Sequence, residues 1–170
     1  MNSTSARALA VARPVIQVLT VLNIFYGACI ALLLIWSFFI EGWPERPLGF
    51  DLVKMHPWAP NGLRAIVVVG VLGAAIAHTI LRRLLAIVDT VRGGDPFNLE
   101  NARRLNLIAW SVLSLELLRL VVAAIAYVVW EPGRVDAFSI ASWFAVLMLF
   151  VLSGVFAQGA RMRADLEGTV

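Results

Sequence analysis

Residues 15–40 read VIQVLTVLNIFYGACIALLLIWSFFI and contain no charged side chain. A helix needs about 20 predominantly apolar residues to cross the roughly 30 Å of hydrocarbon in a bilayer, and this run exceeds that length. It is also longer than the hydrophobic region of about 7–15 residues in a signal peptide, although Arg7 and Arg13 precede it. The run therefore predicts a membrane-spanning helix that the chain retains.

Three further apolar runs, at residues 63–81, 105–130 and 138–157, approach or exceed the length of a span. Helix is the expected form because a single segment in lipid must satisfy its own backbone, and the alternating pattern of barrel strands is absent. Hydrophobic residues make up 61% of the 170 residues, more than a soluble domain of this size can bury. The sequence predicts an all-α protein, a four-helix transmembrane bundle that forms one membrane domain over residues 1–170.

The basic residues predict the orientation of the bundle, because cytoplasmic segments beside membrane helices are enriched in Lys and Arg. The N-terminal arm, the loop between the second and third spans and the C-terminal tail carry Arg7, Arg13, Arg82, Arg83, Arg92, Arg103, Arg104, Arg161 and Arg163. The other side carries only Arg46, Lys54, Arg64 and Arg134. We therefore expect the N-terminus, the C-terminus and the central loop to be cytoplasmic.

The central loop has a helical beginning and a sharp end. Apolar and charged residues continue at roughly helical spacing from Arg82 to Asp89, so we expect the second helix to run past the membrane. The sequence Gly93-Gly94-Asp95-Pro96 then predicts a turn, because glycine permits it and proline cannot continue a helix. Either Asn98 or Asn101 is expected to cap the next helix.

Two charged residues, Glu116 and Arg119, lie near the middle of the third span. A charge there costs at least about 2.5 kcal/mol on insertion scales, so both side chains should face the bundle or water. A spacing of three residues places them on one helix face, where they can neutralise each other. The pair is either a proton relay or polar ligand site, or a structural ion pair that fixes helix packing. The structural ion pair is the favoured interpretation, because no second acid within the membrane is available to relay protons.

The remaining residues give little sign of chemistry. His56 and His78 lie near opposite faces of the membrane, which disfavours a bis-histidine haem, and no Cys/His cluster has the spacing of metal ligands. Phosphate-loop, zinc-protease and nucleophile-elbow motifs are absent. We expect no enzyme activity, no cofactor and no metal. Direct binding of nucleic acid is also not expected, because the basic residues flank the spans.

Small residues recur four apart in the second span, as Gly70/Ala74 and Gly73/Ala77. Such pairs let helix backbones approach closely in a membrane. Packing inside the bundle is the favoured interpretation, and a dimer interface is the alternative. The oligomeric state is left open by the sequence.

Two segments resemble a bacterial family of membrane proteins known as domain of unknown function 2975. Residues 94–105, GDPFNLENARRL, are similar to its signature between the second and third spans. Residues 155–170, VFAQGARMRADLEGTV, are similar to its closing pattern, an aromatic residue and glycine at the membrane edge, a basic and acidic turn and a terminal Thr-Val. The resemblance implies a four-helix protein of the bacterial inner or cytoplasmic membrane.

The resemblance also implies a partner, because members of that family are often encoded beside a small helix-turn-helix DNA-binding protein. Both signature segments are expected on the cytoplasmic side, where they can form one surface. The residues expected there are Pro96, Phe97, Asn101, Arg103, Arg104, Gly159, Thr169 and Val170. Phe97 is either an apolar anchor for a partner or a ring that enters the bilayer interface.

The leading functional hypothesis is a non-enzymatic regulator or scaffold that binds a cytoplasmic protein such as that transcription factor. The alternative is a small transporter or channel component that uses Glu116 and Arg119. A third role, an assembly subunit of a larger membrane complex, shares the sequence features of the first. Apart from such a protein, the expected partner is the lipid bilayer.

Overall fold

The computed structural model describes residues 3–44, 58–94, 96–129 and 139–167. Within these residues there are four helices: α1 (Ser3–Trp36), α4 (Ala59–Arg92), α5 (Leu99–Val129) and α6 (Ile140–Glu167). Each is long and apolar enough to cross a membrane. The described residues are otherwise turn or irregular, without a strand, so the predicted all-α class with four membrane-span-like helices is confirmed.

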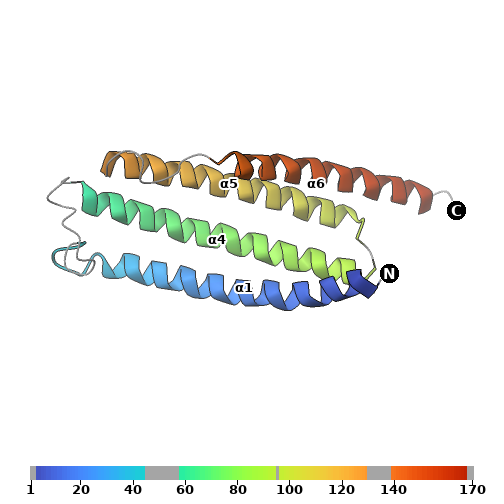
Figure 1. Ribbon diagram of the computed structural model, residues 1–170, viewed down its shortest axis with the longest axis horizontal. Helices are drawn as coiled ribbons and strands as arrows, with labels where there is room; N and C mark the ends of the chain where they lie inside the picture. Colours follow the sequence, from blue (N-terminus) through green and yellow to red (C-terminus); the bar gives the residue numbers. More distant parts are fainter. Residues whose placement is uncertain (1–2, 45–57, 95, 130–138, 168–170) are drawn as a thin grey trace.

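The helices pack side by side in the order of the chain. The substantial helix–helix contacts among the described residues join α1 to α4, α4 to α5, and α5 to α6. Figure 1 shows this order, with the N-terminus, the α4–α5 turn and the C-terminus at one end of the molecule. We call this end the basic end, because Arg82, Arg83, Arg103, Arg104 and Arg161 lie towards it.

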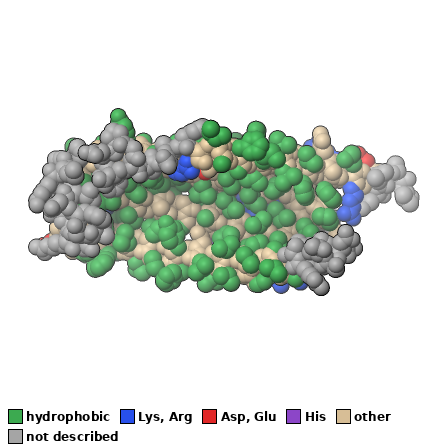
Figure 2. All heavy atoms as spheres, viewed as in Figure 1, with side chains coloured by type: hydrophobic (Ala, Val, Ile, Leu, Met, Phe, Trp, Pro, Cys, Tyr) green, Lys and Arg blue, Asp and Glu red, His purple; other side chains and the backbone are tan. Residues whose placement is uncertain are grey.

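Apolar side chains cover most of the visible face between the two ends (Figure 2). Every helix exposes large apolar residues, among them Phe25 on α1, Leu72 on α4, Leu117 on α5 and Phe144 on α6. In water this surface would be costly, whereas a bilayer is as apolar as the side chains themselves. The surface therefore fits a chain that crosses the membrane several times.

The helices are longer than the predicted spans. The second helix continues to Arg92, which confirms the predicted extension, and α6 continues to Glu167 beyond the predicted end at residue 157. The first span was expected to reach Ile40, but α1 ends at Trp36, and residues 37–39 form turns. The predicted boundaries at Trp130 and Phe138 lie outside the described residues.

Small residues bring α1 and α4 close together inside the chain. A Cβ added to Gly27 of α1 would lie 3.3 Å from the Cβ of Ala74 on α4. Beside this contact, the side-chain amide of Asn23 donates a hydrogen bond of 3.0 Å to the Ala74 carbonyl oxygen. Gly70 faces Ile30 of α1, and Gly73 faces Leu115 of α5. The small residues of α4 thus serve packing with both neighbouring helices, as the favoured interpretation expected.

The α1–α4 pair is also held at both ends. Away from the basic end, Nη2 of Arg64 donates to the carbonyl oxygen of Ser37 at 2.8 Å, and its guanidinium lies 4.8 Å from the centre of the Phe38 ring. At the basic end, Nε of Arg13 lies 3.1 Å from Oδ1 of Asp89. Arg64 satisfies a carbonyl that the end of α1 leaves open, which matters where little water is available.

Enlarging Gly27 should separate α1 from α4. We expect Gly27→Leu to lower the free energy of unfolding by about 1–3 kcal/mol, because the new side chain collides with Ala74. The matched control is Gly154→Leu, since a Cβ at Gly154 meets nothing within 4 Å. Thermal unfolding in detergent measures both variants. Equal transition temperatures for the two variants would contradict close packing at Gly27.

Candidate functional site

The α4–α5 turn begins at two glycines. The Gly93 N–H donates to the Asp89 carbonyl at 3.1 Å, and the Gly94 N–H donates to the Val91 carbonyl at 3.1 Å. Gly94 has a φ of 87°, a left-handed conformation that favours glycine. The predicted stop after α4 is therefore confirmed, and its geometry reverses the chain towards α5.

Asn98 starts α5. Its side-chain oxygen accepts a hydrogen bond of 2.7 Å from the backbone N–H of Asn101, which is the third residue of the helix. This is the contact expected of an N-cap, and it satisfies one of the backbone donors that a helix start leaves open. Of the two caps that the sequence allowed, the structure has Asn98.

The side chain of Asn101 instead joins α5 to the end of α4 by hydrogen bonds. Its side chain is 1% exposed, and its amide nitrogen donates to Oγ1 of Thr90 at 2.7 Å and to the Pro96 carbonyl at 3.2 Å. Its Oδ1 accepts from Nη1 of Arg104 at 3.1 Å. Thr90 also lies 2.8 Å from the carbonyl oxygen of Ile87 in its own helix. A buried amide with both its donor and its acceptor satisfied fixes a unique geometry, because each lost partner would leave a polar group unpaired.

The two arginines of the signature have different surroundings. Arg104 is tied into the hairpin, since Nη1 also donates to the Ala86 carbonyl at 3.3 Å and Nε lies 3.4 Å from Oε1 of Glu100. Arg103 is exposed, and it makes no hydrogen bond or ion pair within the part of the chain that the structure describes. Arg103 is therefore the one of the two that is open to a partner.

Phe97 brings the two signature segments together. Its ring centre lies 5.2 Å from that of Phe156 on α6, at an interplanar angle of 31°. Gly159, one turn further along α6, leaves room for the ring, because a Cβ there would lie 3.4 Å from Cδ1 of Phe97. Close by, the hydroxyl of Ser153 donates to the Ala102 carbonyl at 3.4 Å. The turn is thus docked on α6, while Phe97 remains 47% exposed.

The last turns of α6 project beyond the other helices (Figure 1). Ser153 lies beside Ala102, which is close to the start of α5, and α6 continues from Ser153 to Glu167, about 20 Å at 1.5 Å per residue. Arg161, Met162 and Arg163 on this projection are exposed.

The predicted surface residues therefore fall into three groups. Phe97 and Gly159 meet at the junction of the turn with α6, Pro96 directly precedes Phe97, and Arg103 is exposed. Asn101 and Arg104 hold the hairpin together and present little to a partner. Thr169 and Val170 lie outside the described residues.

The sequence does not single out Thr90 or Phe156 as functional residues. Thr90 lies eleven residues before Asn101, so a tight hairpin at Gly93-Gly94 places the two opposite each other. The sequence gives less indication of the contact between Phe156 and Phe97, because an aromatic residue in an apolar helix does not reveal its neighbour in another helix.

Glu116 and Arg119 form an ion pair within α5. Nη1 of Arg119 lies 3.7 Å from Oε2 of Glu116, and the two side chains are 34% and 15% exposed respectively. Nε of Arg119 is buried and has no hydrogen-bond partner among the described residues. No group of three or more His, Cys, Asp or Glu able to hold a metal ion occurs in the same described part of the chain. The pair therefore neutralises itself within one helix.

The model of the protein family described as protein of unknown function (DUF2975) matches residues 41–170. The chain belongs to this family. The match includes both signature segments and three of the four helices, α4, α5 and α6. No curated protein and no solved structure matches the chain.

A double-mutant cycle tests the role of the ion pair. We expect Glu116→Gln to lower the free energy of unfolding by roughly 2–3 kcal/mol, because it leaves the Arg119 charge unpaired in hydrocarbon. The double variant Glu116→Gln/Arg119→Gln should recover part of this loss, since it removes both charges. Thermal unfolding in detergent of the two single variants, Glu116→Gln and Arg119→Gln, and of the double variant measures the cycle. Glu100→Gln is the control, because its exposed pair with Arg104 contributes at most about 1 kcal/mol.

The same variants distinguish the transport alternative. A structural pair predicts that Glu116→Gln changes stability and leaves proton or solute flux in proteoliposomes unaltered. A changed flux at unchanged stability would contradict the structural role and support a transporter or channel component.

Proposed function

We propose that this protein is a non-enzymatic regulator or scaffold of the bacterial cytoplasmic membrane that binds a cytoplasmic protein at its basic end. The observation that carries the proposal is the contact of Phe97 with Phe156 and Gly159. It joins two signature segments, far apart in the chain, into one surface at the end that the charge pattern predicts to be cytoplasmic.

The composition of this surface supports binding of a protein. Aromatic and arginine side chains are enriched among the residues that dominate binding energy. Phe97 and Met162 expose apolar area, and the exposed side chains of Arg103 and Arg161 add positive charge at the same end of the molecule. An acidic or mixed surface with an apolar centre is the complement that such a patch would recognise.

The partner class rests on the family resemblance. A small helix-turn-helix transcription factor encoded beside family members would be held at the membrane, away from its operators, while it occupied this surface. Sequestration needs no catalysis, and a mutually neutralised Glu116–Arg119 pair favours this role over the transport alternative.

Co-purification tests the proposal. We expect mild cross-linking in native membranes, followed by mass spectrometry, to recover a small DNA-binding protein with the wild-type chain. Phe97→Ala and removal of the last six residues should each reduce its recovery about tenfold or more, as loss of a binding hot spot does. Because Phe97 also packs on Phe156, the surface variant Met162→Asp is included, since Met162 is 63% exposed and its replacement disturbs little packing.

The control is Phe39→Ala, which removes an exposed aromatic ring near the opposite end of the chain. Recovery of a partner that is unchanged by Phe97→Ala, Met162→Asp and the truncation would contradict the proposed surface. Recovery of subunits of a membrane complex in place of a DNA-binding protein would contradict the regulator and favour an assembly role.

A further inference from the structure

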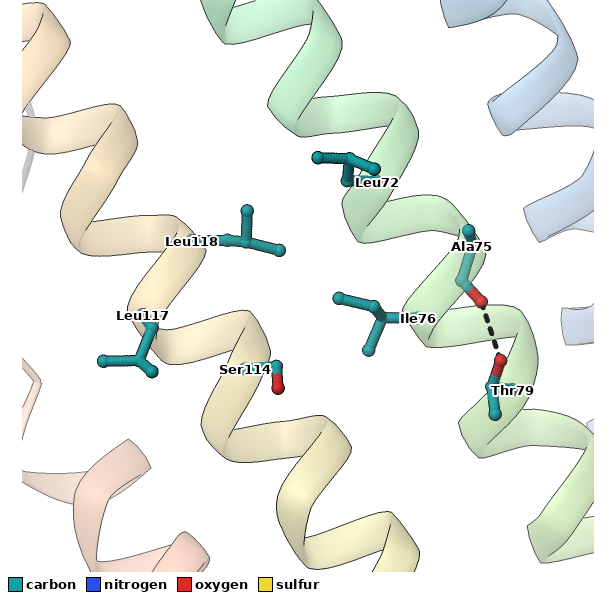
Figure 3. A pocket seen from close by; sticks show the side chains of 7 residues that line it. All are labelled: Leu72, Ala75, Ile76, Thr79, Ser114, Leu117 and Leu118. Carbon is teal, nitrogen blue, oxygen red and sulfur yellow. Dashed lines mark hydrogen bonds between the residues drawn. The ribbon is translucent and has the colours of Figure 1, made fainter.

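Two hollows adjoin each other between α4 and α5. The first has a volume of about 490 Å³, and its lining residues come from the middle parts of α4 and α5. Figure 3 shows these residues. Its lining is Leu72, Ala75, Ile76, Thr79, Ser114, Leu117 and Leu118. The second has a volume of about 350 Å³, and its lining is His78, Thr79, Arg82, Arg83, Ala86 and Arg104. Because Thr79 lines both, the two hollows adjoin along α4, and we call them together the α4–α5 groove. The first hollow is its inner part, and the second, nearer the basic end, is its outer part.

The inner part of the groove is lined mainly by apolar side chains, and its hydroxyl groups are already hydrogen-bonded. Leu72 and Ile76 of α4 point towards Leu118 of α5 (Figure 3). The two hydroxyl groups there are satisfied within their own helices. Thr79 donates to the Ala75 carbonyl at 3.0 Å, and Ser114 donates to the Trp110 carbonyl at 2.9 Å. This part of the groove therefore offers dispersion contacts to a hydrocarbon chain and no free donor.

The outer part of the groove carries a net positive charge. Its lining has three guanidinium groups and an imidazole, with no carboxylate among them. Glu100 is the only acid paired with any of them in the described residues, through Arg104. Arg83 donates to the Leu107 carbonyl and to Oγ of Ser111, both at 3.4 Å, which leaves its charge uncompensated. Arg82 is exposed and forms no ion pair with a described residue.

His78, which also lines the outer part of the groove, has a ring nitrogen left unsatisfied by the described residues. Its Nδ1 is buried and has no hydrogen-bond partner among the described residues. A buried polar nitrogen without a partner is uncommon, and the cavity it lines is basic.

The length of the groove fits one leaflet. Leu72 and Arg82 are ten residues apart, about 15 Å along the helix axis, which is half of the roughly 30 Å hydrocarbon thickness. We propose that the α4–α5 groove binds one anionic phospholipid, with an acyl chain along Leu72–Thr79 and the phosphate at Arg82 and Arg83. Basic pockets between membrane helices recognise anionic head groups in this way.

Native mass spectrometry of the full chain in mild detergent tests the site. With phosphatidylglycerol we expect one lipid to remain bound per chain, and with phosphatidylcholine little retention. Arg82→Gln should weaken binding of phosphatidylglycerol about fivefold, the contribution of one basic residue to binding of anionic lipid. The matched control is Arg103→Gln, which removes the same charge from an exposed position outside the groove and should leave binding unchanged.

A second pair of variants tests the acyl-chain part. Ala75→Phe should fill the groove and displace the lipid, while Ala28→Phe, at an exposed position on α1, should not. Equal retention of phosphatidylcholine, or equal losses in Arg82→Gln and Arg103→Gln, would overturn the proposal. Displacement of phosphatidylglycerol by millimolar inorganic phosphate, together with unchanged binding in Ala75→Phe, would show a site for a free anion and also overturn it. The result is independent of partner binding at Phe97.

Discussion

A buried amide in the α4–α5 hairpin constrains the basic end of the molecule. Asn101 reaches Thr90 on α4, the Pro96 carbonyl in the turn and Arg104 on its own helix, and it is almost completely withdrawn from solvent. Apolar packing alone allows helices in lipid to slide and rotate, because the lipid is as apolar as the side chains. A satisfied polar network has one geometry, and leaving its members unpaired would cost about 1–3 kcal/mol each. The register of α4 against α5 follows from it.

Two surfaces depend on that register. On one side, the turn presents Phe97 to Phe156 of α6, so the hairpin and the projecting end of α6 form a continuous surface. On the other, Arg104 is drawn towards α4 and completes the basic lining that Arg82 and Arg83 begin. A single side chain thus supports both the surface proposed for a cytoplasmic protein and the groove proposed for a lipid. The two proposals use different residues and can fail separately.

The sequence predicted features that depend on local chemistry or on the solvent. Long apolar runs predicted membrane helices, Gly93-Gly94 predicted a turn, and an Asn ahead of α5 predicted a cap. Apart from the small-residue face of α4, the sequence did not predict which helix faces meet, because lipid-facing and buried positions are equally apolar in a membrane protein. The sequence therefore places Asn101 on the partner surface, whereas the structure buries it against Thr90. The docking of Phe97 on α6 required the same missing information.

Cross-linking of Phe97→Cys to Phe156→Cys in native membranes, in a Cys29→Ser background with a short thiol-reactive reagent, tests most directly whether Asn101 holds the turn against α6. We expect efficient cross-linking, which persists when exposed Asn106 is replaced by Leu and falls sharply with Asn101→Leu at equal membrane content. Cross-linking unaffected by Asn101→Leu would contradict this role of Asn101, because the turn would then reach α6 without the hydrogen bonds of the Asn101 side chain. Absence of cross-linking in the double-cysteine protein with Asn101 intact would contradict the contact between the turn and α6.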